Sequence, residues 1–331
     1  MRRIAAIALA LLVLVPTAGC GGEDADLTIY SGRNERLVGD LVKDYEKRTG
    51  LNVEVRYGDS AELAAQIAEE GNNSPADVFF AQDAGALGSV EPQLAPLPAA
   101  IQQKSPERYR DPKGRWVGVS ARSRVVAFDS RELQDGDLPD TVFDFTKPEW
   151  KGRIGLAPTN ASFQAFVSAM RLEIGDERTR QWLEGIKANG AKTYENNIQT
   201  EEAIARNEVD VGFVNHYYAY ELRAEHADFP VRNHFLRKGD PGSLVNAAGG
   251  GVLKTTDAKP EAERFVNFLL SREAQLYFAD KLYEYPVAAG VKPPDGLPPL
   301  DDLQGPDIKL ADLGGELRST LQMLDQVGLT S

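Results

Sequence analysis

Two consecutive tyrosines, Tyr217 and Tyr218, are the residues in this sequence whose type and spacing best suit a chemical role. They follow an apolar run that begins at Val211, where a strand should give way to a turn. Two phenolates are hard oxygen donors, which a hard trivalent cation such as ferric iron favours over imidazole or thioether. Because a phenol ionises only near about pH 10, a strongly polarising metal is needed to deprotonate it at neutral pH. The pair therefore predicts a ferric site, with buried aromatic packing as the alternative. His216, directly before the pair, is expected to be a hydrogen-bonding neighbour rather than a ligand.

A ferric ion held by two phenolates keeps one positive charge, so an anion is expected beside it, with carbonate and phosphate as candidates. The run Asn160-Ala161-Ser162 opens a predicted helix, whose free backbone N–H groups and dipole suit an anion. Plain N-capping by Asn160 or Ser162 is an equally simple explanation, and both can hold. Three arginines near predicted strand ends would bind an anion if they face the cleft, and otherwise would be solvated or paired with carboxylates: Arg33, Arg122 and Arg124.

The N-terminus has the pattern of a targeting segment. Two arginines precede an apolar stretch over residues 4–15, and small residues follow. Residues 1–19 are predicted to be a cleaved signal peptide, because the apolar stretch is shorter than the roughly 20 residues of a membrane-spanning helix. Cys20, the only cysteine, lies in a sequence that resembles a lipobox. We therefore expect a lipid on Cys20, a tether over residues 20–26 and a place on the extracytoplasmic face of the cell membrane, with an ordinary cleaved signal peptide as the alternative.

The composition narrows the classes of partner and reaction. Without the predicted signal peptide, 35 basic residues stand against 50 acidic ones, a formal net charge of −15, so nucleic acid is not expected as a partner. With no other thiol, the mature chain has no disulfide, thiolate metal site or cysteine nucleophile. The sequence contains only three histidines and no Ser-His-Asp order, nucleophile elbow, phosphate loop or His-Glu-x-x-His pattern. An extracytoplasmic enzyme is therefore a remote alternative.

Short apolar runs alternate with segments of helical period, which is typical of an α/β protein. Strands are predicted at residues 27–30, 52–57, 77–80, 124–128, 153–157 and 209–214. Helices are predicted at residues 35–48, 61–69, 163–174, 177–188, 259–282 and 313–327. A mature chain of roughly 310 residues exceeds the size at which one core usually keeps growing, so two domains are expected.

The N-terminal third resembles the opening of a periplasmic-type substrate-binding protein, with strands and helices leading into the run Ala-Asp-Val-Phe-Phe at residues 76–80. The resemblance implies a two-lobed α/β fold of type II, in which each lobe is a mixed sheet flanked by helices. The ligand would lie between the lobes, at the carboxyl ends of strands. The implied first lobe is residues 27–125 with 246–298, and the second is residues 126–245 with 299–331.

The tyrosine segment makes the resemblance more specific. The run D-V-G-F-V-N-H-Y-Y at residues 210–218 is similar to the double-tyrosine motif of the bacterial ferric-iron-binding proteins that feed ABC importers. Further segments resemble the same family in order and spacing, at residues 29–33, 76–80, 116–126 and 150–155. By this resemblance, Tyr217 and Tyr218 match the two iron-ligating tyrosines. The residues that match the anion cradle are Asn196, Asn215 and the turn Asn160, Ala161 and Ser162.

The first lobe departs from the family's pattern. Asn34 stands where some members have a histidine, Gln82 where some have a carboxylate, and Phe163 where some have a third tyrosine. We consider three outcomes, in this order: fewer protein ligands with more from anion and water, substitution by Glu35 or Asp83, or a change of ligand.

The resemblance implies a monomeric, lipid-anchored receptor that captures ferric iron with a synergistic anion and passes it to an ABC permease driven by a cytoplasmic ATPase. The first alternative keeps the fold and replaces iron by a small anion or another small solute.

Overall fold

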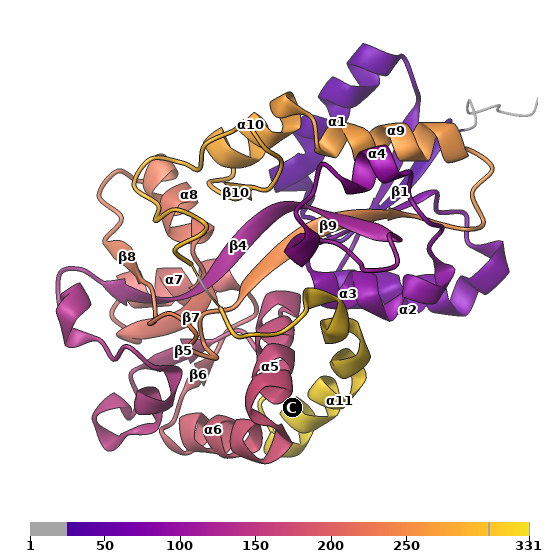
Figure 1. Ribbon diagram of the computed structural model, residues 1–331. Coiled ribbons are helices and arrows are strands. Elements are labelled where there is room, and N and C mark those ends of the chain that lie inside the picture. Colours follow the sequence, from indigo (N-terminus) through magenta and orange to yellow (C-terminus); the bar gives the residue numbers. More distant parts are fainter. Residues whose placement is uncertain (1–24, 304, 331) are drawn as a thin grey trace, which may run out of the picture.

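The computed structural model describes residues 25–303 and 305–330. Cys20, the predicted signal peptide and most of the predicted tether lie outside these residues. The described chain is a mixed α/β structure whose strands follow one another in the order β2-β1-β3-β9-β4-β7-β5-β6, with β10 and β8 each paired to β4 (Figure 1). No helix within the described residues is long and apolar enough to cross a membrane.

One long strand, β4 (Trp116–Asp129), belongs to two sheets. Its first part pairs with β9 (Val245–Val252), as far as Ser123 opposite Val245. Its second part pairs with β7 (Val211–Asn215), beginning with Arg124 opposite Asn215. The first sheet consists of β2 (Val53–Tyr57), β1 (Leu27–Ser31), β3 (Val78–Ala81), β9, the first part of β4 and β10 (Tyr285–Pro286). The second sheet consists of the rest of β4 with β7, β5 (Ile154–Leu156), β6 (Lys192–Thr193) and β8 (Val231–His234).

Helices cover the sheets, and most begin at a side-chain cap. They are α1 (Glu35–Thr49), α2 (Ser60–Glu70), α3 (Ala84–Ser89), α4 (Ala99–Gln102), α5 (Ala161–Ile174), α6 (Asp176–Ala188), α7 (Asn197–Ala205), α8 (Tyr217–Glu225), α9 (Lys259–Leu269), α10 (Arg272–Asp280) and α11 (Leu313–Val327).

Two predicted elements differ from the structure. The predicted helix over residues 259–282 is two helices, because Ser271 ends the first run and caps α10 by accepting a hydrogen bond from the N–H of Ala274 at 3.2 Å. The predicted strand over residues 124–128 is too short, since β4 begins at Trp116.

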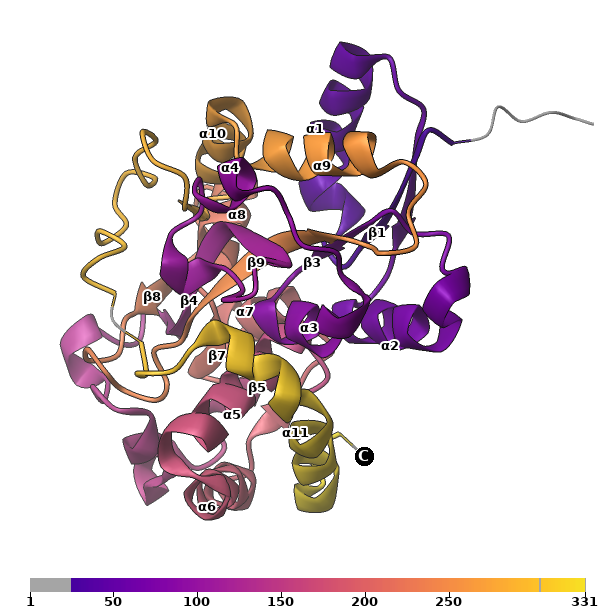
Figure 2. The same ribbon diagram turned by 45° about the vertical axis from the view of Figure 1, so that its right-hand side comes forward.

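The C-terminal helix α11 packs against α3 on one side and α5 on the other (Figure 2). At the crossing with α3, a Cβ on Gly88 would lie 2.9 Å from the Cα of Gly314, so the two backbones can approach only because both residues are glycine. α11 therefore contacts helices beside both sheets, and the division of the chain into two lobes at residues 298 and 299 stays a prediction.

Candidate metal and anion site

The two tyrosines open helix α8, directly after β7 ends at Asn215. Both phenol rings are buried and lie against each other, with ring centroids 4.1 Å apart. Buried phenol hydroxyls usually find a hydrogen-bond partner. Within residues 25–303 and 305–330, however, the hydroxyl of Tyr217 forms no hydrogen bond of standard geometry, although it lies close enough to Tyr218 to oppose the rise in the pKa of that phenol. Aromatic packing alone leaves this oxygen unexplained, whereas a bound cation would occupy it.

Burial raises the pKa of Tyr217 well above its ordinary value, and the neighbouring Tyr218 raises it further, while Arg33 and Arg122 oppose the shift. Burial also raises the pKa of Tyr218. Both phenols therefore keep their protons at neutral pH in the absence of a metal. A cation must polarise them strongly to bind as phenolate, which selects for high charge.

Three arginines lie near the tyrosines, and all three are buried. Arg33 comes from the loop after β1, while Arg122 and Arg124 alternate along β4 and so share one face of that strand. Arg33 and Arg124 interact electrostatically with both phenols, and Arg122 interacts with Tyr217. The predicted anion-binding arginines are thus brought together with the predicted metal ligands.

Many donors of these arginines are unpaired. Among the described residues, no nitrogen of the Arg122 guanidinium has a hydrogen-bond partner, and the same holds for Nε and Nη1 of Arg33 and Nε of Arg124. An unpaired buried charge costs several kcal/mol, about 3–5 when one partner of a buried pair is missing. Burial lowers the pKa of Arg124 to about 9. The arrangement is therefore complementary to an anion with several oxygen acceptors.

A buried carboxylate that the sequence analysis missed, Glu284, lies in the same place. Its Oε1 accepts a hydrogen bond from Nη2 of Arg33 at 2.6 Å, and its Oε2 accepts one from Oγ of Ser120 at 2.5 Å. Burial alone would raise the pKa of Glu284, but Arg33 and Arg122 outweigh it and hold the pKa below its usual value. The only local signal was an acidic residue between the two tyrosines Tyr283 and Tyr285.

The side chain of Asn160 caps the start of α5. Oδ1 of Asn160 accepts hydrogen bonds from the N–H and the hydroxyl of Ser162, at 3.1 and 2.6 Å. Oγ of Ser162 also accepts from Nη1 of Arg124 at 3.1 Å, and Nη2 of Arg124 donates to the carbonyl of Phe213. The capping explanation therefore holds for Asn160. Arg124 is the cation that stands at this helix start, and anion binding by Asn160, Ala161 and Ser162 stays a prediction.

The other two residues of the predicted anion cradle differ in their surroundings. Asn196 caps α7 by accepting a hydrogen bond from the N–H of Gln199 at 2.9 Å. Asn215 is buried, and its Nδ2 has no partner among the described residues. Asn215 thus has a free donor for a ligand, whereas the side-chain oxygen of Asn196 is engaged in a cap.

The four candidate first-lobe ligands are not equivalent. Asn34 and Glu35 are exposed, and Asn34 caps α1 by accepting from the N–H of Arg36 at 2.9 Å. Gln82 is half-buried with an unpaired Nε2, while Asp83 is buried with an unpaired Oδ2. Across the described ranges, no cluster of three or more His, Cys, Asp or Glu side chains could hold a metal. The ligand roles of these four residues stay predictions. Gln82 and Asp83 are less exposed than Asn34 and Glu35, and each has an unpaired polar atom.

Asp83 gives a prediction about stability. Its Oδ1 caps α3, and burial raises its pKa to about 6, although Arg122 opposes the shift. The proton stabilises the folded state below about pH 4, and this contribution is lost as the pH rises through about 6. Asp83→Asn, which keeps the capping oxygen, should be about 3 kcal/mol more stable than the native protein near pH 7.5 and equal to it near pH 4. Urea unfolding at both pH values measures the difference, and equal stabilities near neutral pH would contradict it.

His216 is buried and is engaged by backbone groups at both ring nitrogens. The N–H of Ser123 donates to Nδ1 at 3.2 Å, so Nε2 carries the proton and donates to the carbonyl of Tyr283 at 2.9 Å. Burial lowers the pKa of His216 to about 4, which keeps the ring neutral. This is the arrangement expected of a hydrogen-bonding neighbour of the tyrosines.

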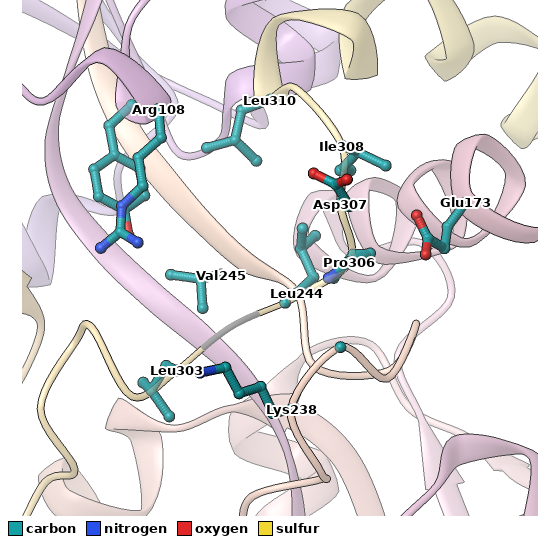
Figure 3. Close-up of a pocket in the computed structure, with 13 residues that line it drawn as sticks. Arg108, Glu173, Lys238, Leu244, Val245, Leu303, Pro306, Asp307, Ile308 and Leu310 are labelled. Carbon is teal, nitrogen blue, oxygen red and sulfur yellow. The ribbon is translucent and has the colours of Figure 1, made fainter.

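Two ion pairs connect helix α1 with helix α8. Arg36 at the start of α1 forms ion pairs with Glu221 and Glu225 of α8, at 3.3 and 2.9 Å. These pairs join the helix that follows Arg33 to the helix that carries the tyrosines. A pocket of about 590 Å³ lies elsewhere, lined by Arg108, Lys238, Glu173, Asp307 and neighbouring residues, and contains none of the predicted site residues (Figure 3).

Two sheets that share a strand, with a buried polar site where the strand passes between them, define a two-lobed solute-binding protein. A family model for bacterial extracellular solute-binding proteins matches residues 63–303, and the chain belongs to this family. The two-lobed α/β fold expected from the sequence is thereby confirmed.

Relatives of the chain are known from sequence and structure. The Fe(3+)-binding periplasmic protein of Serratia marcescens is 32% identical over 96% of this chain and 95% of its own length. The iron-bound crystal structure of HitA from Pseudomonas aeruginosa has a TM-score of 0.86 at 34% identity, covering 91% of this chain and 99% of HitA. A Trichodesmium protein in complex with iron and citrate has a TM-score of 0.78 at 30% identity, covering 91% and 99%.

Proposed function

We propose that this protein captures ferric iron together with an anion outside the cytoplasm. The observation that carries the proposal is the buried hydroxyl of Tyr217, which lacks a well-formed hydrogen bond, on a ring that packs against Tyr218 near three buried arginines. Similarity to the Serratia protein and to iron-bound HitA supports the same cargo.

The charges of the site residues favour the binding of a metal cation together with an anion. Two phenolates would bind the metal, and the unpaired nitrogens of Arg33 and Arg122 would bind the anion. The metal alone does not suffice, because a ferric ion beside three arginines would be repelled unless an anion offset their charge. Carbonate and phosphate remain our candidates for the anion, with Asn215 as a further donor.

We further propose that the protein delivers its cargo to an ABC permease and its ATPase, as a monomer held to the membrane by a lipid on Cys20. Membership of the solute-binding family supports the transport role. The protein would bind its cargo and release it without a catalytic step.

Ferric loading tests the proposal. Purified protein mixed with ferric nitrilotriacetate and phosphate should develop a visible phenolate-to-iron charge-transfer band, and its melting temperature should rise by mass action. A protein that stays colourless and metal-free over a range of carbonate, phosphate and citrate concentrations would refute iron as the cargo.

A second candidate function is binding of a small anion without metal. The unpaired nitrogens of Arg33, Arg122 and Arg124 favour it. A colourless protein that phosphate or citrate alone stabilises strongly would support this candidate, whereas a band that requires both iron and anion would support the first.

A further inference from the structure

Among the described residues, Glu284 is the one carboxylate that forms a hydrogen bond with any of the three site arginines, and its partner is Arg33. It uses Oε1 for Nη2 of Arg33 at 2.6 Å, and leaves Nε and Nη1 of that guanidinium without a partner. Glu284 thus offsets the charge of Arg33 but uses only part of its hydrogen-bonding capacity. The rest of its donors, and all those of Arg122, are left for a ligand.

The carboxylate is held in place from two directions. Oγ of Ser120, on β4, donates to its Oε2 at 2.5 Å. The preceding residue, Tyr283, has a φ of 53°, which L side chains adopt rarely, and its carbonyl accepts the hydrogen bond from Nε2 of His216. Because His216 directly precedes Tyr217, this hydrogen bond ties the backbone before Glu284 to the segment that carries the tyrosines.

These contacts link the tyrosines to the arginines. His216, next to Tyr217 in the chain, is hydrogen-bonded to the carbonyl of Tyr283, and the following residue, Glu284, is hydrogen-bonded to Arg33. Arg33 in turn interacts electrostatically with Tyr217. Because these groups are buried, each charge acts strongly on its neighbours. Glu284 therefore offsets one of the three positive charges near the tyrosines.

We propose that Glu284 is the built-in counter-anion of the site: it holds Arg33 toward the tyrosines and limits the negative charge that the site accepts from a bound ligand. The inference rests on the proposed function, and it assigns Glu284 a positioning and charge-setting role, not that of a metal ligand. A ligand anion competes with Glu284 for Arg33. Neutralising this carboxylate should accordingly strengthen anion binding and weaken binding of the cation.

The test compares the iron-free native protein with Glu284→Gln, whose amide oxygen can still accept from Arg33. Calorimetric titration with inorganic phosphate should show a dissociation constant about tenfold lower in the variant, as for the loss of a close like charge. Ferric binding at low phosphate should weaken and recover as phosphate is raised. Glu208→Gln, which neutralises a half-exposed carboxylate paired with Arg206 before β7, should change neither measurement by more than about twofold.

A purely structural role would lower the melting temperature without opposite changes in anion and cation binding. Phosphate affinity in Glu284→Gln that is unchanged or weaker overturns the proposal. If this variant does not fold, Arg33→Gln with Glu284→Gln replaces the whole buried pair by neutral groups, which proteins often tolerate. Phosphate binding should then fall below the native level, and an unchanged affinity overturns the inference. Native protein that takes up no iron refutes the proposed function, while the phosphate comparison still decides the role of Glu284.

Discussion

Replacing Tyr217 or Tyr218 by phenylalanine is expected to weaken ferric binding by at least about a hundredfold and to reduce the visible band, and the double variant should lose the band. When four ligands share about 10–16 kcal/mol of metal-binding free energy, each supplies roughly 3 kcal/mol. Iron competition against citrate, followed by absorbance, measures the loss. Phenylalanine keeps the ring packing of the two side chains, so the iron-free melting temperature should hardly change. It should even rise for Tyr217→Phe, because an unpaired buried hydroxyl is removed.

Tyr220 offers a matched control on the same helix. Its hydroxyl lies 3.4 Å from the carbonyl of Gly296 and its ring stacks on Tyr283, away from the buried pair. Tyr220→Phe should retain native iron affinity and colour. Full iron affinity in the Tyr217 and Tyr218 double variant would refute the phenolate site, whatever the behaviour of the control.

Arg122→Met is expected to change stability and binding in opposite directions. The iron-free protein should gain about 1–4 kcal/mol, because a buried guanidinium with no hydrogen-bond partner is replaced by an apolar side chain of similar length. Anion-dependent iron binding should lose about 2–5 kcal/mol, the usual result of removing one side of a buried charge contact. Urea unfolding without iron and phosphate titration with iron measure the two effects.

Arg206→Met is the control, since Arg206 follows α7 and is exposed in ion pairs with Glu202 and Glu208, both of which are half exposed. It should alter stability by less than about 1 kcal/mol and leave binding unchanged. A loss of stability in iron-free Arg122→Met would mean that the guanidinium is satisfied by groups of the protein, and the anion site would lose its main support.

The elements with an apolar period could be predicted well from the sequence. Helix α1 was expected at residues 35–48 and runs over Glu35–Thr49, because its buried leucines recur at helical spacing and Gly50 stops it in the left-handed region. The start of β4 was missed for a reason that concerns function. Arg122, Ser123 and Arg124 interrupt its apolar run, and charged residues on a buried strand contradict the pattern on which strand prediction depends.

The site could be predicted only in part. Tyr217 and Tyr218 stood out because they are adjacent and occur in a recognisable motif, although the helix that they begin was expected to be a turn. Glu284 could not be found in the same way. It meets Arg33 across 251 positions of sequence, and no local pattern records a contact that only the folded sheets create. Asn34 and Glu35 were selected by sequence position alone, and their side chains face solvent.

The passage of β4 from one sheet to the other has a mechanical consequence. Arg122 is paired with Asn246 in the first sheet, whereas Arg124 is paired with Asn215 in the second. Any rotation of one sheet against the other must bend the backbone between these two guanidinium groups and carry Arg33 away from Tyr217. The aromatic pair, which belongs to a single helix, would survive such a movement intact. If the protein binds ferric iron as proposed, separation of the two sheets would disperse the arginines first and loosen the anion before the metal leaves its phenolates.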